Sequence, residues 1–352
     1  MRPLFFADSP TAFALTVSAV AFAVGLLLLV VIAGLGALRR SRKQRTAALE
    51  MRWRGALQQV AEEPENLALP SIGLRELPRF LEAWNRLRES SEGAAASRLE
   101  KLLTRNGIDR RARAMLRSIS MRQRLAAITA VGHLRERGAW DRLSELSKQS
   151  DPVISFAAAR ALLSIDPSHA LEVLLPSIPA RGDWPLARIG TIFHELGPAT
   201  VTPALVTMLF RRPRPGLDRV IKLARFGQGE KISGIVRGWL GSSTDSDVLM
   251  AALAYIEDPA DLPWAHGSAD HAEWRVRMAA ARALGRVGGR DELPTLLHLL
   301  RDPIWWVRYH AAQSLIRLKG LEPFELETLR ENARDAFAAD MLGQALAERR
   351  WS

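Results

Sequence analysis

Histidine and carboxylate side chains are the residues of this chain that could bind a metal ion or transfer protons. Seven histidines are spread over the sequence, and no two have the four-residue spacing with which a helix presents two histidines to zinc. His194 precedes Glu195, and a second group of histidines and carboxylates lies within 266–273, but neither group is supported by a second cluster. We therefore predict no metal site and no bound cofactor.

Patterns typical of nucleophilic and phosphate-handling enzymes are also missing. The chain has no cysteine, which excludes thiol nucleophiles, disulfides and thiolate metal sites. It contains neither the Gly-x-x-x-x-Gly-Lys loop that cradles phosphates nor the Gly-x-Ser-x-Gly turn that presents a serine nucleophile. We predict no catalytic residue, and a protein that is not an enzyme.

Tryptophan and arginine side chains are the strongest candidates for binding chemistry, because both residue types are favoured anchors at protein interfaces. The candidate partner-binding residues are Trp184, Trp274, Trp305, Trp306, Arg277 and Arg308. An alternative interpretation places the tryptophans between repeats as hydrophobic wedges, and the arginines in hydrogen bonds or ion pairs from one repeat to the next. Adjacent residues of a helix do not share one face, so we expect Trp305 and Trp306 to be unequally buried.

These candidates lie within an internal repeat of 29 to 33 residues. Each unit has an anchor position, and the seven anchors are Arg124, Ser155, Arg188, Arg219, Val248, Arg277 and Arg308. Around each anchor, small and apolar residues recur every three or four positions, which predicts an amphipathic helix, and a second helix follows. The sequence therefore predicts an all-α fold, a right-handed α-solenoid of about seven helix pairs in which each pair is buried against its neighbours.

Helix ends are also marked in the sequence. The Asp-Pro pairs at 151–152, 258–259 and 302–303 predict helix starts, because Asp accepts from free amides and Pro suits the first turn. Gly132, Gly227 and Gly285 lie eight residues after their anchors, and we interpret them as helix C-caps.

The segment Asp302-Pro-Ile-Trp-Trp-Val-Arg-Tyr-His-Ala-Ala-Gln-Ser-Leu315 resembles the short bacterial HEAT-like repeat that is also found in phycobilin lyases. The whole layout resembles a group of bacterial membrane-anchored HEAT-repeat proteins, which implies a link to inner-membrane glycosyltransferase and exopolysaccharide systems. A HEAT-like hydroxylase of the deoxyhypusine pathway resembles the same fold, but it repeats the His-Glu pair that occurs here once, at 194–195. The resemblance is specific for the fold and says little about function.

Residues 11–38 form an apolar segment long enough to cross a bilayer. No charged residue occurs from Ser9 to Leu38, whereas about 20 apolar residues suffice for a spanning helix. A cleaved signal peptide is the alternative, but it requires a basic start and a shorter apolar stretch. The sequence predicts one transmembrane helix before the solenoid.

Basic residues after this segment predict its orientation. Seven basic residues and one acid lie between Arg39 and Arg54, which accounts for more than half of the net charge of +11. The positive-inside rule then predicts a single-pass protein of the bacterial inner membrane with its N-terminus outside and its repeats in the cytoplasm. We also predict contacts with anionic lipid headgroups through the basic cluster of Arg39, Arg40, Arg42, Lys43 and Arg45. The charge further along the chain is a weak indication of nucleic-acid binding.

The predicted organisation is a short extracytoplasmic N-terminus (1–10), a transmembrane helix (11–38), a basic juxtamembrane segment (39–60), a helical N-terminal cap (61–120), HEAT-like repeats (121–320) and C-terminal capping helices (321–352). The predicted function is that of a membrane-anchored adaptor whose solenoid binds a protein partner, with a glycosyltransferase or exopolysaccharide component as the candidate. The alternatives are a nucleic-acid-binding HEAT-like protein and a bilin-lyase-like enzyme.

Overall fold

The computed structural model describes residues 21–24, 26–29, 31–33, 48–49, 51–62, 71–211, 215–333 and 335–351. These residues form helices joined by turns and short loops, and no strand occurs among them. The chain divides into two compact units, Met1–Glu136 and Arg137–Ser352. The all-α prediction is therefore confirmed for the described part of the chain.

The predicted localisation is contradicted. Most of the segment 11–38 lies outside the described residues, and its described parts are helical stretches of three or four residues. A bilayer requires about 20 residues of apolar helix. Across the ranges that the structure describes, no helix is both long and apolar enough to span a membrane. This finding overturns the prediction of an inner-membrane protein with its N-terminus outside, and the basic cluster at 39–45 lies outside the described residues.

The first unit contains the helical residues 51–62 and four further helices. They are α2 (Leu77–Glu89), α3 (Gly93–Arg105), α4 (Ile108–Met115) and α5 (Met121–His133). Trp53 and Phe80 are fully buried and meet edge to face, with ring centroids 5.2 Å apart. The buried Trp84 donates from Nε1 to the carbonyl of Leu99 at 3.0 Å, which satisfies the polar atom of its ring inside the core.

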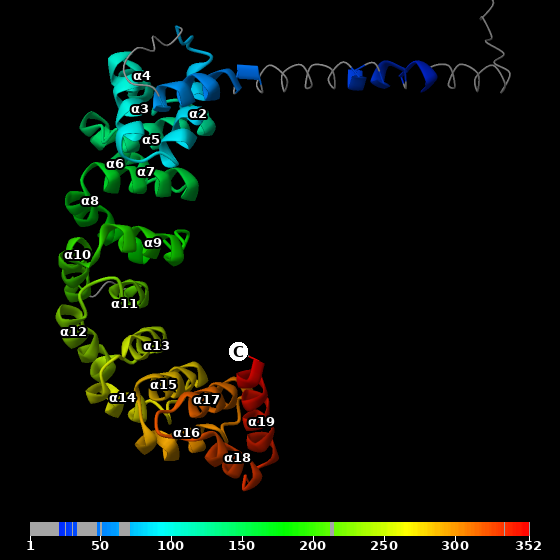
Figure 1. The fold of residues 1–352 in the computed structure, drawn as a ribbon, viewed down its shortest axis with the longest axis vertical. Helices are drawn as coiled ribbons and strands as arrows, with labels where there is room; N and C mark the ends of the chain where they lie inside the picture. The colour runs from blue at the N-terminus through cyan, green and yellow to red at the C-terminus, as the bar shows by residue number, and fades with distance from the viewer. Residues whose placement is uncertain are drawn as a thin grey trace, which may run out of the picture. The chain divides into compact units, whose positions relative to one another are not determined.

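The second unit is a succession of helix pairs in two layers (Figure 1). One layer contains α7 (Pro152–Ile165), α9 (Leu186–Leu196), α11 (Leu217–Ala224), α13 (Ser246–Tyr255), α15 (Trp274–Val287), α17 (Trp305–Arg317) and α19 (Ala336–Trp351). The other contains α6 (Trp140–Ser147), α8 (Pro167–Leu174), α10 (Pro198–Arg211), α12 (Gly229–Ser242), α14 (Leu262–Gly267), α16 (Leu293–Leu299) and α18 (Pro323–Glu331). From α9 to α19, successive members of the first layer pack on one another, as a solenoid requires.

Four short 3₁₀ segments complete the second unit: η1 (Arg137–Ala139), η2 (Leu175–Ala180), η3 (Pro259–Asp261) and η4 (Arg290–Glu292). Alanines lie where α15 and α17 pack on each other, and Ala280, Ala281, Ala311 and Ala312 are fully buried. Small side chains let helices approach closely, so this Ala-rich seam sets the spacing of α15 and α17.

The predicted helix starts are confirmed at two Asp-Pro pairs and displaced at the third. Asp151 caps α7 by accepting from the amides of Val153 and Ile154 at 2.9 Å. Asp258 likewise caps η3. At the third pair, the N-cap of α17 is Ile304, and Asp302 accepts from its amide at 2.8 Å.

The C-cap interpretation of the three glycines is wrong. The C-cap of α11 is Arg225, and Gly227 lies two residues beyond it. Gly132 and Gly285 lie inside α5 and α15, and the C-caps of these helices are Leu134 and Gly288. A methyl group on Gly285 would lie 2.2 Å from the Cβ atom of Ser314 on α17. Glycine is required there because the backbone of α15 approaches α17 closely.

Candidate functional site

Trp184 is a buried member of a polar network between helix pairs. Its side chain is 2% exposed, and Nε1 donates to the hydroxyl of Ser155 at 3.1 Å. The ring packs edge to face on Phe156, with centroids 5.8 Å apart, and the Arg181 guanidinium lies 4.7 Å from its centroid. Trp184 therefore serves packing within the unit and presents no surface to a partner.

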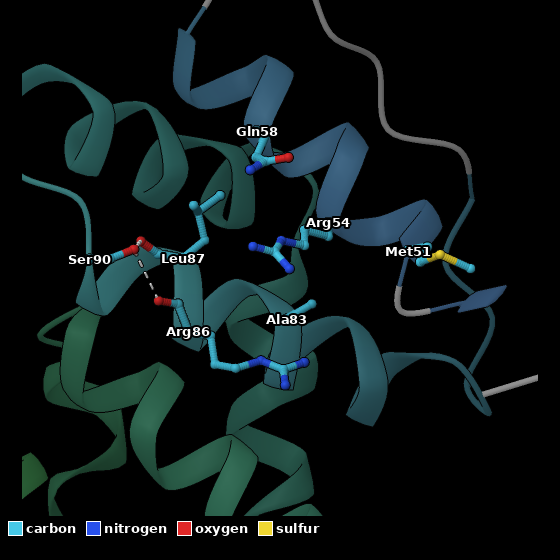
Figure 2. A pocket seen from close by; sticks show the side chains of 7 residues that line it. All are labelled: Met51, Arg54, Gln58, Ala83, Arg86, Leu87 and Ser90. Atoms are coloured by element: carbon cyan, nitrogen blue, oxygen red, sulfur yellow. Dashed lines mark hydrogen bonds between the residues drawn. The ribbon is translucent and has the colours of Figure 1, made fainter. Parts of the chain in front are cut away.

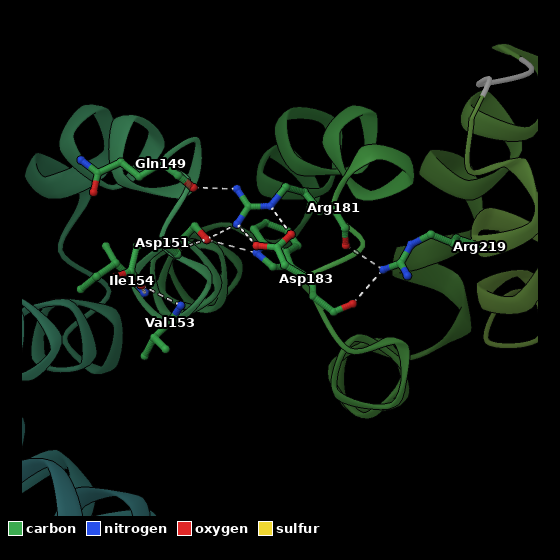
Figure 3. A network of polar contacts seen from close by, with 9 residues as sticks. Gln149, Asp151, Val153, Ile154, Arg181, Asp183 and Arg219 are labelled. Carbon is green, nitrogen blue, oxygen red and sulfur yellow. Dashed lines mark hydrogen bonds and ion pairs between the residues drawn. The ribbon is translucent and has the colours of Figure 1, made fainter.

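Two arginines extend this network along the chain (Figure 3). Arg181 donates to the carbonyl of Gln149 at 2.8 Å and also pairs with Asp183. The hydrogen bond from Arg181 to Asp183 lowers the pKa of the Asp183 carboxyl. Arg219 of α11 donates to the carbonyls of Arg181 and Trp184 at 2.9 and 2.7 Å. The loop before α9 is thus held by Arg181 from within the loop and by Arg219 from the following repeat.

Arg277 and Arg308 occupy the same position in α15 and α17, four residues into each helix. Arg277 donates to the backbone carbonyl of His271 at 2.8 Å and pairs through two nitrogens with Asp302, at 2.6 and 3.0 Å. Arg308 donates to the carbonyl of Asp302 at 2.7 Å, and its guanidinium lies 5.3 Å from the ring centroid of Phe337. Each arginine fixes the loop before its own helix and also contacts the next repeat.

The other three candidate tryptophans differ in exposure. Trp274 is half-buried and packs against the core of the second unit. Trp305 and Trp306 are 39% and 50% exposed. Among the candidate tryptophans, the surface open to a partner is therefore at the start of α17, because Trp184 and Trp274 are less exposed than Trp305 and Trp306.

Five ring contacts join the exposed aromatic residues of α17, and we call Trp305, Trp306, Tyr309 and His310 the aromatic cluster. Trp305 stacks on Tyr309 with centroids 5.1 Å apart, and Trp306 stacks on His310 at 6.5 Å. Both pairs are four residues apart, the spacing that brings side chains together on a helix. Trp305 and Trp306 meet edge to face at 4.8 Å, so the exposed rings support one another.

The Tyr309 hydroxyl anchors the aromatic cluster to α19 by donating to Glu348 Oε2 at 3.1 Å. Gln313 donates to the same carboxylate oxygen at 2.5 Å. Gln344 donates to the other carboxylate oxygen of Glu348 at 3.1 Å, so three neutral side chains hold this carboxylate.

Arginines lie beside the aromatic cluster, and sequence reasoning did not select them. Burial lowers the pKa of His310, and the nearby Arg282 and Arg317 lower it further. Arg286 donates to the carbonyls of Leu253 and Ile256 at 3.1 and 2.9 Å. We call Arg282, Arg286 and Arg317 the arginine stripe. All three residues keep exposed surface, although the guanidinium of Arg286 is partly desolvated where it meets the two carbonyls.

A signal for the stripe was present in the repeat itself. Arg286 and Arg317 are 31 residues apart, so they occupy equivalent positions in α15 and α17. Arg282 and Arg286 are four apart and share a face of α15.

The first unit contains a separate pocket of 490 Å³ between the helical residues 51–62 and α2 (Figure 2). It is lined by Met51, Arg54, Gln58, Ala83, Arg86, Leu87 and Ser90. The Arg54 side chain extends into the space between the two helices. No acidic side chain lines this pocket, and none of the predicted site residues lies in it.

The histidines and acids of the 266–273 segment are divided among different partners. Nε2 of His266 lies against the carboxylate of the buried Glu292, and Nδ1 shares a 3.0 Å hydrogen bond with the Thr295 hydroxyl. His298 pairs with Asp270 at 2.9 Å, and His271 accepts from the amide of Glu273 at 3.0 Å. Within the described residues, no group of three or more such side chains could hold a metal ion.

Comparison with known proteins identifies the repeat. The family model described as HEAT repeats matches residues 242–316 and 262–347. The two overlapping matches cover 242–347, so this part of the chain is similar to HEAT repeats. The phycocyanobilin lyase subunit alpha of Nostoc sp. (strain PCC 7120 / SAG 25.82 / UTEX 2576) is 40% identical over 83 residues. That match covers 23% of this chain and 28% of the relative, so less than a third of the relative's length is shared.

Solved structures that are similar to this chain include Kap121p bound to Pho4p and an engineered protein. The Kap121p match covers 84% of this chain and 41% of Kap121p, at 13% identity and a TM-score of 0.45. The engineered protein is 17% identical over 83% of this chain and 88% of its own, with a TM-score of 0.37.

Proposed function

We propose that this chain is a HEAT-repeat scaffold that binds a protein partner through the aromatic cluster of α17. The observation that carries the proposal is the exposure of Trp305 and Trp306, adjacent large aromatic side chains that remain 39% and 50% open to solvent. Tryptophan and tyrosine are enriched in the energetic centres of protein interfaces. Burial of these rings by a partner would remove a substantial apolar area from water.

The rigidity of α17 supports this function. Its opposite face is fully buried at Val307, Ala311 and Leu315, which fixes the helix within the repeat stack. The ring stacking described above holds Trp305 and Trp306 in place before any partner arrives. A preorganised surface loses less conformational entropy on binding than a flexible one.

The identity of the partner is a further part of the proposal. Resemblance to HEAT-repeat proteins of glycosyltransferase and exopolysaccharide systems supports a component of such a system as the first candidate. The proposal for α17 does not depend on that candidate, because the exposed rings fit any protein with a complementary apolar patch.

Site-specific photo-crosslinking tests the function. A benzophenone amino acid replaces Trp306 in one variant and Phe324 in a second, which serves as the matched control because Phe324 is 71% exposed on α18. After irradiation in the native host, we expect one dominant protein adduct from position 306 and none from position 324. The same adducts from both positions, or no protein adduct from position 306, would contradict the proposal.

Bilin handling is a second candidate, favoured by the 40% identity to part of a phycocyanobilin lyase subunit. Adding phycocyanobilin to the purified protein distinguishes the two. A scaffold leaves the visible absorption of the pigment unchanged. A stoichiometric, red-shifted band that disappears in a Trp306→Ala variant would favour the pigment over a protein partner.

A further inference from the structure

The arginine stripe is a local accumulation of positive charge on two helices that pack on each other, α15 and α17. Within the part of the chain that the structure describes, neither Arg282 nor Arg317 has a carboxylate oxygen within 4.0 Å of its guanidinium. Nearby arginines differ in this respect. Arg277 pairs with Asp302, and Arg290 pairs with Glu325.

Like charges at this spacing repel each other. Arg282 and Arg286 lie four residues apart on α15, an arrangement that destabilises a helix when both carry the same charge. Burial lowers the pKa of Arg286, and Arg282 and Arg225 lower it further, whereas Glu257 opposes them. Glu348 keeps its negative charge while it accepts from Tyr309, Gln313 and Gln344, but its carboxylate forms no ion pair with Arg282 or Arg317 among the described residues. The stripe therefore lacks a full internal counter-charge.

The positive charge of the arginine stripe is local, because the second unit as a whole is nearly neutral. Residues 137–352 contain 27 Lys and Arg and 26 Asp and Glu, a net charge of +1. Nucleic-acid binding relies on many phosphate contacts and a broad positive field. Three arginines in a nearly neutral unit favour a short anionic segment over a polynucleotide.

We propose that the arginine stripe and the aromatic cluster together bind an acidic segment of a protein partner, with carboxylates on Arg282 and Arg317 and an apolar side chain against Trp306. Guanidinium groups form two parallel hydrogen bonds with a carboxylate, which adds direction to the attraction of charge. Trp306, His310, Gln313 and Arg317 follow one another along α17 at spacings of four, three and four residues, so they share one face of the helix. One extended peptide lying along this face can contact both the rings and Arg317. This inference rests on the proposed function and specifies the chemistry of the partner.

Fluorescence anisotropy with defined probes tests the inference on the full-length protein. The probes are a labelled peptide of alternating glutamates and leucines, the same peptide with every glutamate replaced by glutamine, and a 20-nucleotide single-stranded DNA. The test variant is Arg282→Gln/Arg317→Gln. Its matched control is Arg160→Gln/Arg188→Gln, which removes the same charge from exposed positions on α7 and α9.

We expect the acidic peptide to bind at least roughly tenfold more tightly than the glutamine peptide. The test variant should lose roughly tenfold in affinity, the control less than about twofold, and added salt should weaken binding. Equal binding of the acidic and glutamine peptides, or unchanged affinity in the test variant, would overturn the inference. DNA binding that exceeds peptide binding and depends on Arg282 and Arg317 would replace it with a nucleic-acid site.

The two proposals fail in different ways. If the partner crosslinks at position 306 but binds the Arg282→Gln/Arg317→Gln variant normally, the acidic segment is wrong and the scaffold function stands. If the acidic peptide binds through the arginines but no protein crosslinks at position 306, the scaffold function through α17 fails.

Discussion

Trp184 and Trp306 place the same side chain in opposite environments. Trp184 is 2% exposed and hydrogen-bonded to Ser155, whereas Trp306 is 50% exposed and stacks on His310. Both lie near the start of a repeat, so their sequence positions do not separate them. The difference arises from the loop before α9, where Arg181 and Arg219 enclose Trp184, and such long-range contacts are not visible in a local pattern.

Truncation of the two side chains should therefore affect stability differently. Trp184→Ala leaves a large cavity in the core, and we expect it to lower the free energy of unfolding by about 3–5 kcal/mol, although the Ser155 hydroxyl keeps its hydrogen bonds with Asp151 and Arg181. Trp306→Ala should change it by less than about 0.5 kcal/mol. Urea denaturation followed by circular dichroism measures both. Equal losses would show that Trp306 is a core residue.

Gly285 recurs at the expected position of the repeat, but it is a packing residue inside α15 and not the predicted C-cap. The eight-residue offset from its anchor predicted a helix end, but α15 continues to Val287. Proximity to Ser314 decides the residue type, and that contact crosses from one repeat to the next. A single repeat considered alone does not contain this information.

Adding a methyl group at Gly285 should force α15 and α17 apart. We expect Gly285→Ala to lower the free energy of unfolding by about 1–3 kcal/mol, as overpacking does in well-packed cores. Gly234→Ala is the matched control, because Gly234 lies inside α12 with no atom within 4 Å of the added methyl. This control should be neutral or stabilising by up to about 1 kcal/mol, since alanine favours helix. The two variants would be compared by urea denaturation, and a neutral Gly285→Ala would refute the close approach.

At the scale of elements, much of the second unit could be predicted from the sequence. The repeat period and the Ala-rich runs predicted α7, α13, α15 and α17, and Asp151 begins its helix as expected. The alternative interpretation of Arg277 as a repeat-to-repeat contact also agrees with its pairing to Asp302. The arginine stripe was missed because it becomes visible only when equivalent positions of α15 and α17 are compared across the repeat.

The loop before α9 carries a pH-dependent contribution to stability. The hydrogen bond from Arg181 lowers the pKa of Asp183 below its usual value of 3.8 in the folded protein. The resulting stabilisation is fully present above the pKa of the unfolded chain and is lost as the pH falls through the folded-state pKa. We expect wild type to be more stable than Asp183→Asn at pH 7, and the difference to shrink below about pH 4.

Chemical denaturation at a series of pH values measures this difference. The effect should be small because the ion pair is partly exposed. Asp340→Asn, at an exposed position of α19, is the control for the change in net charge. A difference between wild type and Asp183→Asn that grows as the pH falls would contradict the assignment.

At the scale of the whole molecule, charge is divided between the two units. Residues 1–136 contain 22 Lys and Arg and 12 Asp and Glu, so they carry +10 of the net charge of +11. The second unit is nearly neutral, which makes the exposed arginines of α15 and α17 a local feature. The sequence-based localisation relied on the apolar segment 11–38, and no described helix meets the requirements of a membrane span.

The scaffold function is tested most directly by an affinity measurement. The crosslinked partner is purified, and its binding to a Trp305→Ala/Trp306→Ala variant is measured. Isothermal titration calorimetry would compare this variant with wild type and with Phe324→Ala. Loss of two interface tryptophans should weaken binding by at least roughly 30-fold, while Phe324→Ala should stay within about twofold of wild type. A double variant that binds the partner as tightly as wild type would contradict the account.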